Sequence, residues 1–368
     1  MKKYLKFAAF CLTMAVVAPL TTACSDDPQE EEVKADTTAL QAELTACETL
    51  LANAKTTDYP QDAIDAFKKV VAAVKAGLEK NPSQTEVDNM LKQLEEAKVK
   101  FLAAAYDALP TDKMVCAWDF ETEGDALKSN GVKDWEAVLT TGPKEIFGSD
   151  TQKPTFVEGV KGGKAINFAK GGHLEVANYT TGDLLKDELS IAVWVKPTTT
   201  TPGNYIISLN YWNTFKFNLQ TENKPFFTAA TKNADGTAGI IDADNEVAES
   251  VKNNAWTHLV VTISYKEHTM KFYVNGELTK TWDQTGKPQL ANNAWYTDWK
   301  SACGKTLPLM IGMNTTYEEA SAWSWFSKDT TAEQWLNDQC FQGAIDQLKV
   351  FTVALTDGQA KKLYNDEK

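Results

Sequence analysis

The stretch ELSIAVWVKP at Glu188–Pro197 decides the predicted fold. Every second side chain from Leu189 to Val195 is aliphatic, and the side chains between them stay mostly apolar up to Lys196. Because successive side chains of a strand point to opposite faces, this pattern predicts a strand that is covered on both faces. Such a strand belongs in the interior of a two-layered β-sandwich.

Further strand-like stretches follow one another over residues 114–351. The dipeptide Asn275-Gly276 separates two of them and is typical of a type I′ hairpin, because it tolerates the positive φ angles of that turn. Residues 231–252 are polar and are predicted to form a loop around Asp242. Many short strands without helices between them predict an antiparallel sandwich and argue against an α/β sheet.

The order of these stretches forms a pattern. Its parts include GKAINF at 163–168, LSIAVWVKP at 189–197, AWTHLVVTI at 255–263 and FQGAIDQLKVFTVALT at 341–356. Together they resemble the laminin-G-like / concanavalin A-like lectin and glucanase family. The resemblance implies a mostly β protein in which residues 110–368 form a jelly-roll sandwich of two curved antiparallel sheets.

Residues 37–109 have a different character. Apolar residues recur there at every third or fourth position in three successive segments, which predicts three helices. Ser83-Gln-Thr-Glu86 is a capping box at the start of the third segment, and the short links predict an antiparallel bundle. Residues 80–104 resemble FIVAR-type helical modules of bacterial surface proteins. That resemblance implies a spacer below the sandwich.

The N-terminus predicts export. Residues 1–23 contain lysines followed by a short apolar run, as in a secretion signal. Cys24 and the acidic residues after it resemble a bacterial lipoprotein signal with a surface-export tract. The resemblance implies that Cys24 is lipidated and holds the chain in the outer membrane, facing the cell surface, with residues 24–36 as an acidic tether. A plain secretory signal with Cys24 as a free thiol is the alternative.

The net charge of the chain limits which classes of partner are expected. The formal net charge is −13, and the hydrophobic share of 43% is that of a globular protein. Nucleic acids and anionic membranes attract basic surfaces, so neither is an expected partner. An uncharged ligand fits this balance better. The alternative, that the acidity serves only solubility, stays open.

The sequence favours binding over catalysis. A retaining glycosidase needs two carboxylates about 5 Å apart. Glucanases of the resembling family place them on one strand as Glu-x-Asp-x-x-Glu, and the nearest run here, Asp242-x-Asp244-x-Glu246, has another spacing. We therefore expect a non-catalytic carbohydrate-binding protein. A divergent glycoside hydrolase or lyase on the same fold and a protein-binding adhesin module are the alternatives.

Tryptophan density points to the ligand site. Trp residues cluster between Trp282 and Trp335, in segments rich in Asn, Thr and Ser that lack a strand period. Exposed aromatic patches mark binding surfaces, and the flat C–H faces of sugars stack on aromatic rings. The predicted ligand-binding residues are Trp295, Tyr296, Trp299, Trp323, Trp325, Tyr211 and Trp212. They would capture a polysaccharide or oligosaccharide and pass it to a glycan importer and glycosidases. Burial of these Trp residues in a satellite core is the alternative.

Two further expectations concern a metal and a disulfide. Many members of the resembling family hold one structural Ca²⁺, and by position the matching residues are Asp119, Gly172 and Asp346. Asp346 as a metal-free cap at a strand end is the alternative. Cys303 and Cys340 both precede predicted strands in a compartment that permits disulfides, and they are expected to form one.

Overall fold

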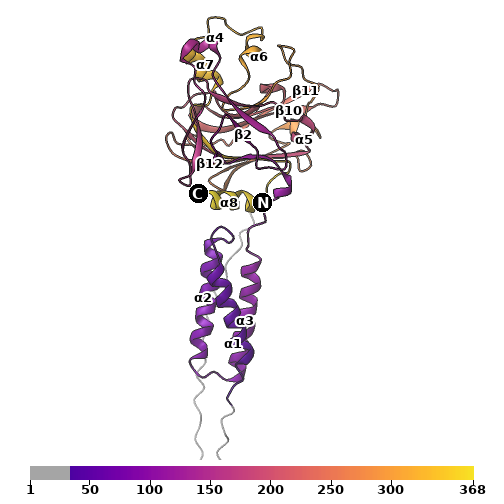
Figure 1. Cartoon of the computed structure of the whole chain (residues 1–368). Coiled ribbons are helices and arrows are strands. Elements are labelled where there is room, and N and C mark those ends of the chain that lie inside the picture. Colours follow the sequence, from indigo (N-terminus) through magenta and orange to yellow (C-terminus); the bar gives the residue numbers. More distant parts are fainter. Residues whose placement is uncertain (1–33) are drawn as a thin grey trace, which may run out of the picture.

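The computed structural model describes residues 34–368. The predicted signal peptide, the lipidation site Cys24 and most of the predicted tether lie outside the described residues. The described chain has two parts, a slender helical bundle and a β-sandwich above it (Figure 1). Over this range, no helix combines the length and the apolar character needed to cross a membrane.

The bundle confirms the predicted three helices. They are α1 (Thr38–Asn53), α2 (Gln61–Leu78) and α3 (Gln84–Leu102). The Ser83 side chain and the Glu86 side chain form the predicted capping box at the start of α3. One core joins the three helices, and its buried members are Leu40, Leu44, Cys47, Phe67, Val71, Val74, Val87, Leu94 and Phe101.

The sandwich consists of two eight-stranded antiparallel sheets, so the predicted fold class is confirmed. We name the first the bundle-side sheet. Its order is β14 (Glu277–Asp283), β13 (Thr269–Val274), β12 (Thr257–Ser264), β7 (Glu188–Pro197), β16 (Gly343–Phe351), β5 (Lys164–Phe168) and β4 (Thr155–Glu158), and β1 (Met114–Trp118) also pairs with β16. The predicted inner strand is β7, which lies between β12 and β16.

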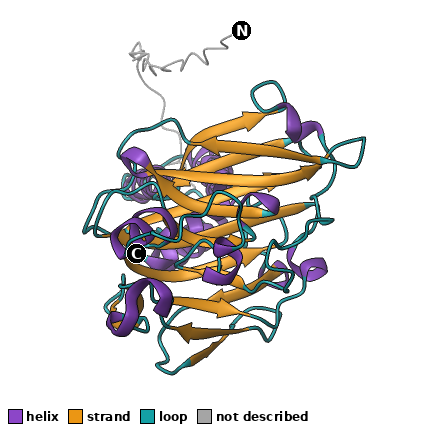
Figure 2. Cartoon of the chain, turned by 90° about the horizontal axis from the view of Figure 1, so that it is seen from above, coloured by secondary structure: helices purple, strands orange, loops and turns teal. Residues whose placement is uncertain are grey.

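We name the second sheet the far sheet. Its order is β11 (Ala238–Asp244), β10 (Lys224–Lys232), β9 (Phe215–Gln220), β8 (Asn204–Leu209), β15 (Leu309–Ile311), β6 (His173–Val176), β3 (Glu136–Thr140) and β2 (Ala126–Lys128). Seen from above, the strands run across the molecule with short helices and loops over them (Figure 2). Aliphatic and aromatic side chains of both sheets, such as Ile191, Val193 and Phe217, form the core between them.

The C-terminal helix α8 (Asp357–Glu367) joins the sandwich to the bundle. Its apolar side packs on the outward face of the bundle-side sheet, against residues that include Ala192 and Tyr273. Its other side reaches the bundle, where Lys362 forms an ion pair with Asp58 at 2.9 Å. The far sheet therefore turns its outward face away from the bundle, and α4, α6 and α7 lie at that end (Figure 1).

The prediction of a loop at residues 231–252 is wrong for the first half of this range. β10 extends to Lys232 and β11 spans Ala238–Asp244, so Asp242 lies on a strand. β11 is an edge strand whose side chains alternate between exposed and buried. Its exposed positions are Ala238, Ile240 and Asp242, and its buried positions include Gly239 and Ala243, so polar and apolar residues do not alternate along it.

Four short α-helices in the described residues were missing from the sequence prediction. They are α4 (Lys144–Phe147), α5 (Thr181–Leu184), α6 (Tyr317–Ser321) and α7 (Ala332–Gln339). Thr316 caps α6 and Thr331 caps α7 through hydrogen bonds from backbone N–H groups to their side chains. α6 and α7 pack over the outward face of the far sheet, around Met310 of β15.

Candidate functional site

A row of polar side chains crosses the outward face of the far sheet. In β9 the aromatic residues Phe215 and Phe217 point into the core, so Lys216 between them points outward. In the strand register, Lys216 lies opposite Ser208 of β8 and Thr228 of β10, and Thr228 lies opposite Asp242 of β11. The Thr228 hydroxyl donates a hydrogen bond to the Asp242 carboxylate. The sheet pairing thus lines up a cation, two hydroxyls and a carboxylate.

The loop after β8 holds two aromatic rings beside this row. Asn210 and Tyr211 both adopt the left-handed region, with φ angles of 52° and 57°. This conformation is uncommon for a bulky residue such as Tyr211, and such strain costs on the order of 1–3 kcal/mol. Strained residues gather at binding and active sites, because the surrounding contacts must hold them in place. The turn therefore marks this loop as a candidate site.

Four aromatic rings form a continuous stack on this face, which we name the aromatic platform. Trp212 lies 4.2 Å from Tyr211, Tyr211 lies 5.4 Å from Trp323, and Trp323 lies 4.6 Å from Trp325, measured between ring centroids. Trp212 is 45% exposed and Trp325 is 60% exposed. The structure thus brings together four of the seven predicted ligand-binding residues, from two segments far apart in the sequence.

Lys216 lies against the platform. Its Nζ is 4.7 Å from the ring centroid of Tyr211 and 5.3 Å from that of Trp212, and the rings of Tyr205 and Phe226 are also within 6 Å. These are cation–π distances. The side chain is only 5% exposed, and burial lowers the pKa of Lys216 to about 8, with Asp242 acting in the opposite direction. A buried ammonium among aromatic rings therefore lies at the centre of the site.

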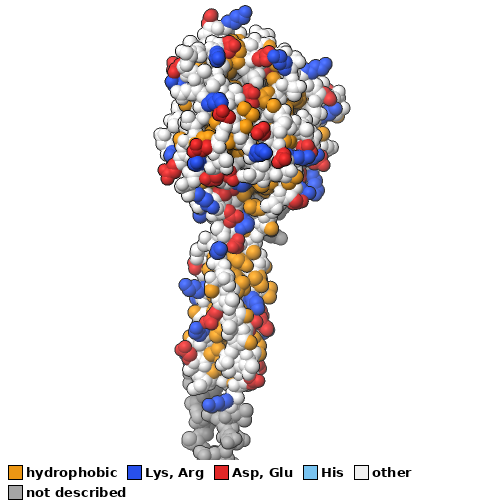
Figure 3. All heavy atoms as spheres, in the orientation of Figure 1, with side chains coloured by type: hydrophobic (Ala, Val, Ile, Leu, Met, Phe, Trp, Pro, Cys, Tyr) orange, Lys and Arg blue, Asp and Glu red, His pale blue; other side chains and the backbone are white. Residues whose placement is uncertain are grey.

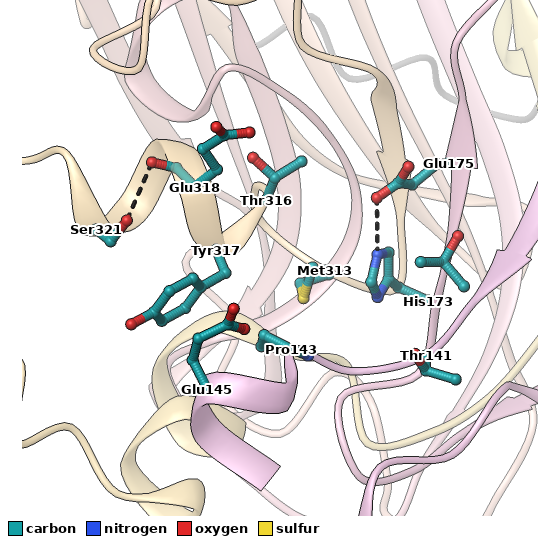
Figure 4. Close-up of a pocket in the computed structure, with 11 residues that line it drawn as sticks. Thr141, Pro143, Glu145, His173, Glu175, Met313, Thr316, Tyr317, Glu318 and Ser321 are labelled. Carbon is teal, nitrogen blue, oxygen red and sulfur yellow. Dashed lines mark hydrogen bonds and ion pairs between the residues drawn. The ribbon is translucent and has the colours of Figure 1, made fainter. Parts of the chain in front are cut away.

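A pocket of about 440 Å³ opens on the same face, between β6 on one side and α4 and α6 on the other (Figure 4). His173 and Glu175 of β6 line one wall, and Glu145 and Tyr317 line the other. The His173 ring contacts the Gly171 carbonyl through Nδ1 at 2.9 Å and the Glu175 carboxylate through Nε2 at 3.2 Å. Because Nδ1 faces a carbonyl, it is the donor of that contact, and Nε2 faces the Glu175 carboxylate.

The pocket and the platform have α6 in common. Tyr317 at the start of α6 lines the pocket and packs against Trp335 of α7 at 5.6 Å between centroids. Trp323 follows α6 and packs against the same cluster of buried residues as Tyr317, which includes Met313 and Trp335. The far face therefore offers a flat aromatic surface and a polar pocket, held by one local core.

The assignment of Trp295 to the ligand site is wrong. Trp295 is 5% exposed and belongs to the main core, where it packs against Phe215 and Tyr265. Its Nε1 donates a hydrogen bond of 2.7 Å to the Lys186 carbonyl. An isolated backbone bridge between Trp295 and Thr231 holds the segment beside β10, and the bond to Lys186 satisfies the only donor of the indole.

Tyr296 and Trp299, the two other predicted residues of this segment, are half-buried. The Tyr296 backbone N–H donates to the Ala230 carbonyl at 2.9 Å, so this residue covers the end of β10. Among residues 34–368, no ring contact joins Tyr296 or Trp299 to the aromatic platform. A ligand-binding role for these two residues stays a prediction.

The structure does not gather the three residues expected to hold calcium. The two carboxylate oxygens of Asp346 accept hydrogen bonds from the backbone N–H groups of Val160 at 2.9 Å and Gln347 at 2.7 Å. Asp119 accepts a hydrogen bond from the Asn130 side chain. Gly172 follows the other end of β5 and packs against the backbone at Gln152.

The hydrogen bonds described above do not join Asp119, Gly172 and Asp346, and their role as one metal site stays a prediction. In the described part of the chain, no three His, Cys, Asp or Glu side chains cluster in a way that suits a metal ion. Burial raises the pKa of Asp346 to about 6, and the nearby Glu121 carboxylate contributes to this rise. Calcium binding itself stays a prediction.

The expected disulfide is also wrong, because Cys303 and Cys340 are both free thiols. Cys340 is buried with Trp335 and Met313 in the core beneath α6 and α7. Cys303 is half-buried in a surface loop, where its backbone N–H donates to the Glu319 carboxylate at 3.0 Å. The two thiols thus belong to different layers of the structure.

The sequence prediction missed Lys216, Asp242 and the pocket residue His173. Lys216 stands in FKFNLQ, where a single charged residue alternates with core aromatics, and this pattern does signal an outward position. Asp242 was assigned to a loop. Neither signal shows that the two side chains lie next to Tyr211, because only the strand register brings them together.

Comparisons with known proteins agree with this fold. Residues 168–305 match the family model Laminin_G_3, described as the concanavalin A-like lectin/glucanases superfamily. The match includes Tyr211, Trp212 and Lys216, whereas Trp323 and Trp325 lie beyond it. A comparison with curated proteins finds no match.

Two solved structures are similar to part of this chain. One is domain 4 of AbnA, a GH43 extracellular arabinanase from Geobacillus stearothermophilus in complex with arabinotriose, with 16% identity, 68% coverage of this chain, 98% coverage of that chain and a TM-score of 0.44. The other comes from a study of the cell entry of botulinum neurotoxin type C, which depends on two ganglioside molecules, with 17% identity, 70% coverage of this chain, 52% coverage of that chain and a TM-score of 0.44. This chain thus spans about half the length of the neurotoxin chain.

Proposed function

We propose that the far face of the sandwich binds a polysaccharide or oligosaccharide without cleaving it. The observation that carries this proposal is the four-ring aromatic platform with exposed tryptophans at both ends, Trp212 and Trp325. An exposed, continuous and preorganised aromatic surface needs an apolar partner. Sugar rings offer flat C–H faces for stacking and hydroxyl groups for the polar side chains beside the platform.

The polar surroundings of the platform support a carbohydrate ligand over a purely apolar one. Asp242 and Lys216 lie on the same sheet face and offer a hydrogen-bond acceptor and a donor. The pocket beside α6 adds Glu145, Glu175 and Tyr317, and its volume of about 440 Å³ is in the usual range for small-molecule sites. A chain that stacks on the platform would place a further sugar unit in this pocket.

We also propose that the protein acts at the cell surface. Lipidation at Cys24 and the acidic tether would anchor it in the outer membrane, and the FIVAR-like bundle would serve as a spacer. This proposal is supported by the position of α6, the helix just before Trp323 and Trp325, at the end of the sandwich away from the bundle (Figure 1). A ligand captured there would be presented outward, to a glycan importer and glycosidases.

The test is a glycan array followed by titration calorimetry, with a Cys24→Ser chain that lacks residues 1–23. Trp212→Ala and Trp325→Ala are expected to weaken binding at least ten-fold, because each removes one end of the stacking surface. The control is Trp256→Ala, which removes a half-buried tryptophan beside Lys196 on the bundle-side sheet. It should leave the affinity unchanged.

Four results would contradict the proposal. Absence of binding to any glycan, or binding unchanged by both platform substitutions, would remove the platform as a carbohydrate site. Release of reducing or unsaturated ends from a bound glycan would favour the hydrolase or lyase alternative. Binding of protein ligands alone would favour the adhesin alternative.

A further inference from the structure

The ammonium group of Lys216 is a buried cation without a conventional partner. Among residues 34–368, no hydrogen bond or salt bridge forms at Nζ, and the ring centroids of Tyr205, Tyr211, Trp212 and Phe226 lie within 6 Å of it. An ammonium group has three N–H donors, and burial of a charge without paired acceptors is costly. Cation–π contacts compensate only part of this loss, at roughly 0.5–2 kcal/mol.

The charged groups around Lys216 leave it short of a direct counter-ion. Asp242 is exposed, and its carboxylate accepts a hydrogen bond from Thr228. Asp338 of α7 is also exposed and influences the tyrosines Tyr205 and Tyr211. Exposed carboxylates are screened by water, so neither replaces a direct contact with the ammonium.

We infer that the ligand carries a carboxylate, as in a uronic or sialic acid unit, and that this carboxylate pairs with Lys216 while a sugar ring stacks on the aromatic platform. This inference rests on the proposed function and specifies its substrate class. An anionic acceptor would meet the ammonium in a mostly water-excluded place, where charge-assisted hydrogen bonds are strong.

The inference runs against the overall charge of −13, which disfavours anionic ligands at long range. The local arrangement outweighs this effect at contact, because salt screens charges more than about 8–10 Å away. In Figure 3, acidic and basic side chains are intermingled over the visible face of the sandwich. The nearest opposing charge is Asp242, so it should compete with the ligand carboxylate for Lys216.

The experiment compares acidic saccharides with neutral counterparts of the same shape. Suitable pairs are oligogalacturonate and sialyllactose, each with its own methyl ester, in addition to the acidic and neutral members of a glycan array. At least one acidic ligand is expected to bind ten-fold or more tightly than its neutral counterpart. This preference should shrink at high salt and above pH 8, where Lys216 loses its proton.

Two substitutions with opposite effects test the residue. Lys216→Met keeps the length of the side chain but removes the charge, so the acidic ligand should bind no better than its neutral counterpart. Asp242→Asn removes the competing carboxylate and should raise the ratio of the acidic-ligand affinity to the neutral-ligand affinity. Lys232→Met, at the end of β10, is the control, since its ammonium already pairs with Asp298 at 2.9 Å.

The outcomes separate this inference from the proposed function. Equal binding of acidic and neutral counterparts, or an array that binds only neutral glycans through the platform, would overturn the acidic-ligand inference and leave carbohydrate binding intact. Equal losses for both counterparts in Lys216→Met would also overturn it. Binding of no glycan at all would overturn both. If Lys216→Met folds poorly, Asp242→Asn still tests the inference, provided that its thermal unfolding matches that of wild type.

Discussion

Trp323 stacks on Tyr211 at 5.4 Å between ring centroids, with an angle of 28° between the ring planes. Tyr211 belongs to the strained turn after β8, and Trp323 follows α6, so two separate loops build one surface. Each ring also contacts an exposed tryptophan next to it in its own loop. The contact between Trp323 and Tyr211 thus turns two aromatic pairs into one platform.

Substitution of Trp295 and Trp325 by alanine should separate stability from binding. Trp295→Ala removes a buried indole from the main core and should lower the free energy of unfolding by roughly 3–5 kcal/mol. Trp325→Ala should change it by no more than about 0.5 kcal/mol, because its side chain is largely exposed. Urea unfolding monitored by circular dichroism measures both. Similar losses in the two variants would show that the platform is part of the core.

Acid should weaken the sandwich through His258. This side chain is fully buried next to Trp194 and Glu367, and burial together with repulsion from Lys349 lowers the pKa of His258 to about 3. The unfolded chain has a histidine pKa of about 6.5 and takes up a proton that the folded chain excludes. Below pH 6.5, the free energy of unfolding should therefore fall by up to about 1.4 kcal/mol per pH unit, until about pH 3.

The measurement compares the free energy of unfolding of wild type and His258→Gln between pH 7 and pH 4. The free energy of unfolding of the variant should fall less steeply as the pH decreases. The difference in slope should be up to about 1.4 kcal/mol per pH unit, which corresponds to one bound proton. Burial raises the pKa of Glu367, which acts in the opposite direction, but this residue is present in both proteins. Parallel curves would mean that His258 is charged in the folded state.

Only one cysteine of the folded Cys24→Ser chain should react quickly with a thiol reagent. Cys303 is half-buried, whereas Cys47, Cys116 and Cys340 are buried, and burial raises the pKa of Cys47 to about 11. Because the thiolate is the reactive form, only Cys303 should react quickly with Ellman's reagent at pH 8. The other three should react after unfolding without a reductant. Cys303→Ser serves as the control and should lose the fast phase of the reaction. If two of the four thiols fail to react even after unfolding, the predicted disulfide between Cys303 and Cys340 is restored.

The joint at α8 should couple the melting of the bundle to that of the sandwich. Lys362 pairs with Asp58 at 2.9 Å, and the Asn365 side chain donates to the Thr56 carbonyl at 3.1 Å. Lys362→Met combined with Asn365→Ala should remove about 1–2 kcal/mol of this coupling. Differential scanning calorimetry should then show an earlier and separate transition of the bundle. Lys92→Met, in an exposed pair within α3, is the control and should keep the wild-type profile.

Much of the fold followed from local sequence patterns. Alternation at Glu188–Pro197 predicted an inner strand, and β7 is paired on both sides. The helical period and the capping box at Ser83 predicted the bundle. Patterns of this kind work because the side-chain period is set by the backbone geometry of each element, whatever the rest of the chain does. The edge strand β11 escaped this reasoning, because the apolar Ile240 stands on its exposed face while the small residues Gly239 and Ala243 stand on its buried face.

The sequence by itself determined that the chain has a helical bundle, a β-sandwich and an unusual density of tryptophan in its late loops. Only the tertiary structure decided that Trp295 belongs to the core while Trp325 is exposed, although both stand in segments of similar composition. It also decided that Lys216 lies against the platform rings. The physical reason is that exposure and pairing depend on contacts between segments far apart in the chain, which the sheet register and loop packing create and which no local period encodes.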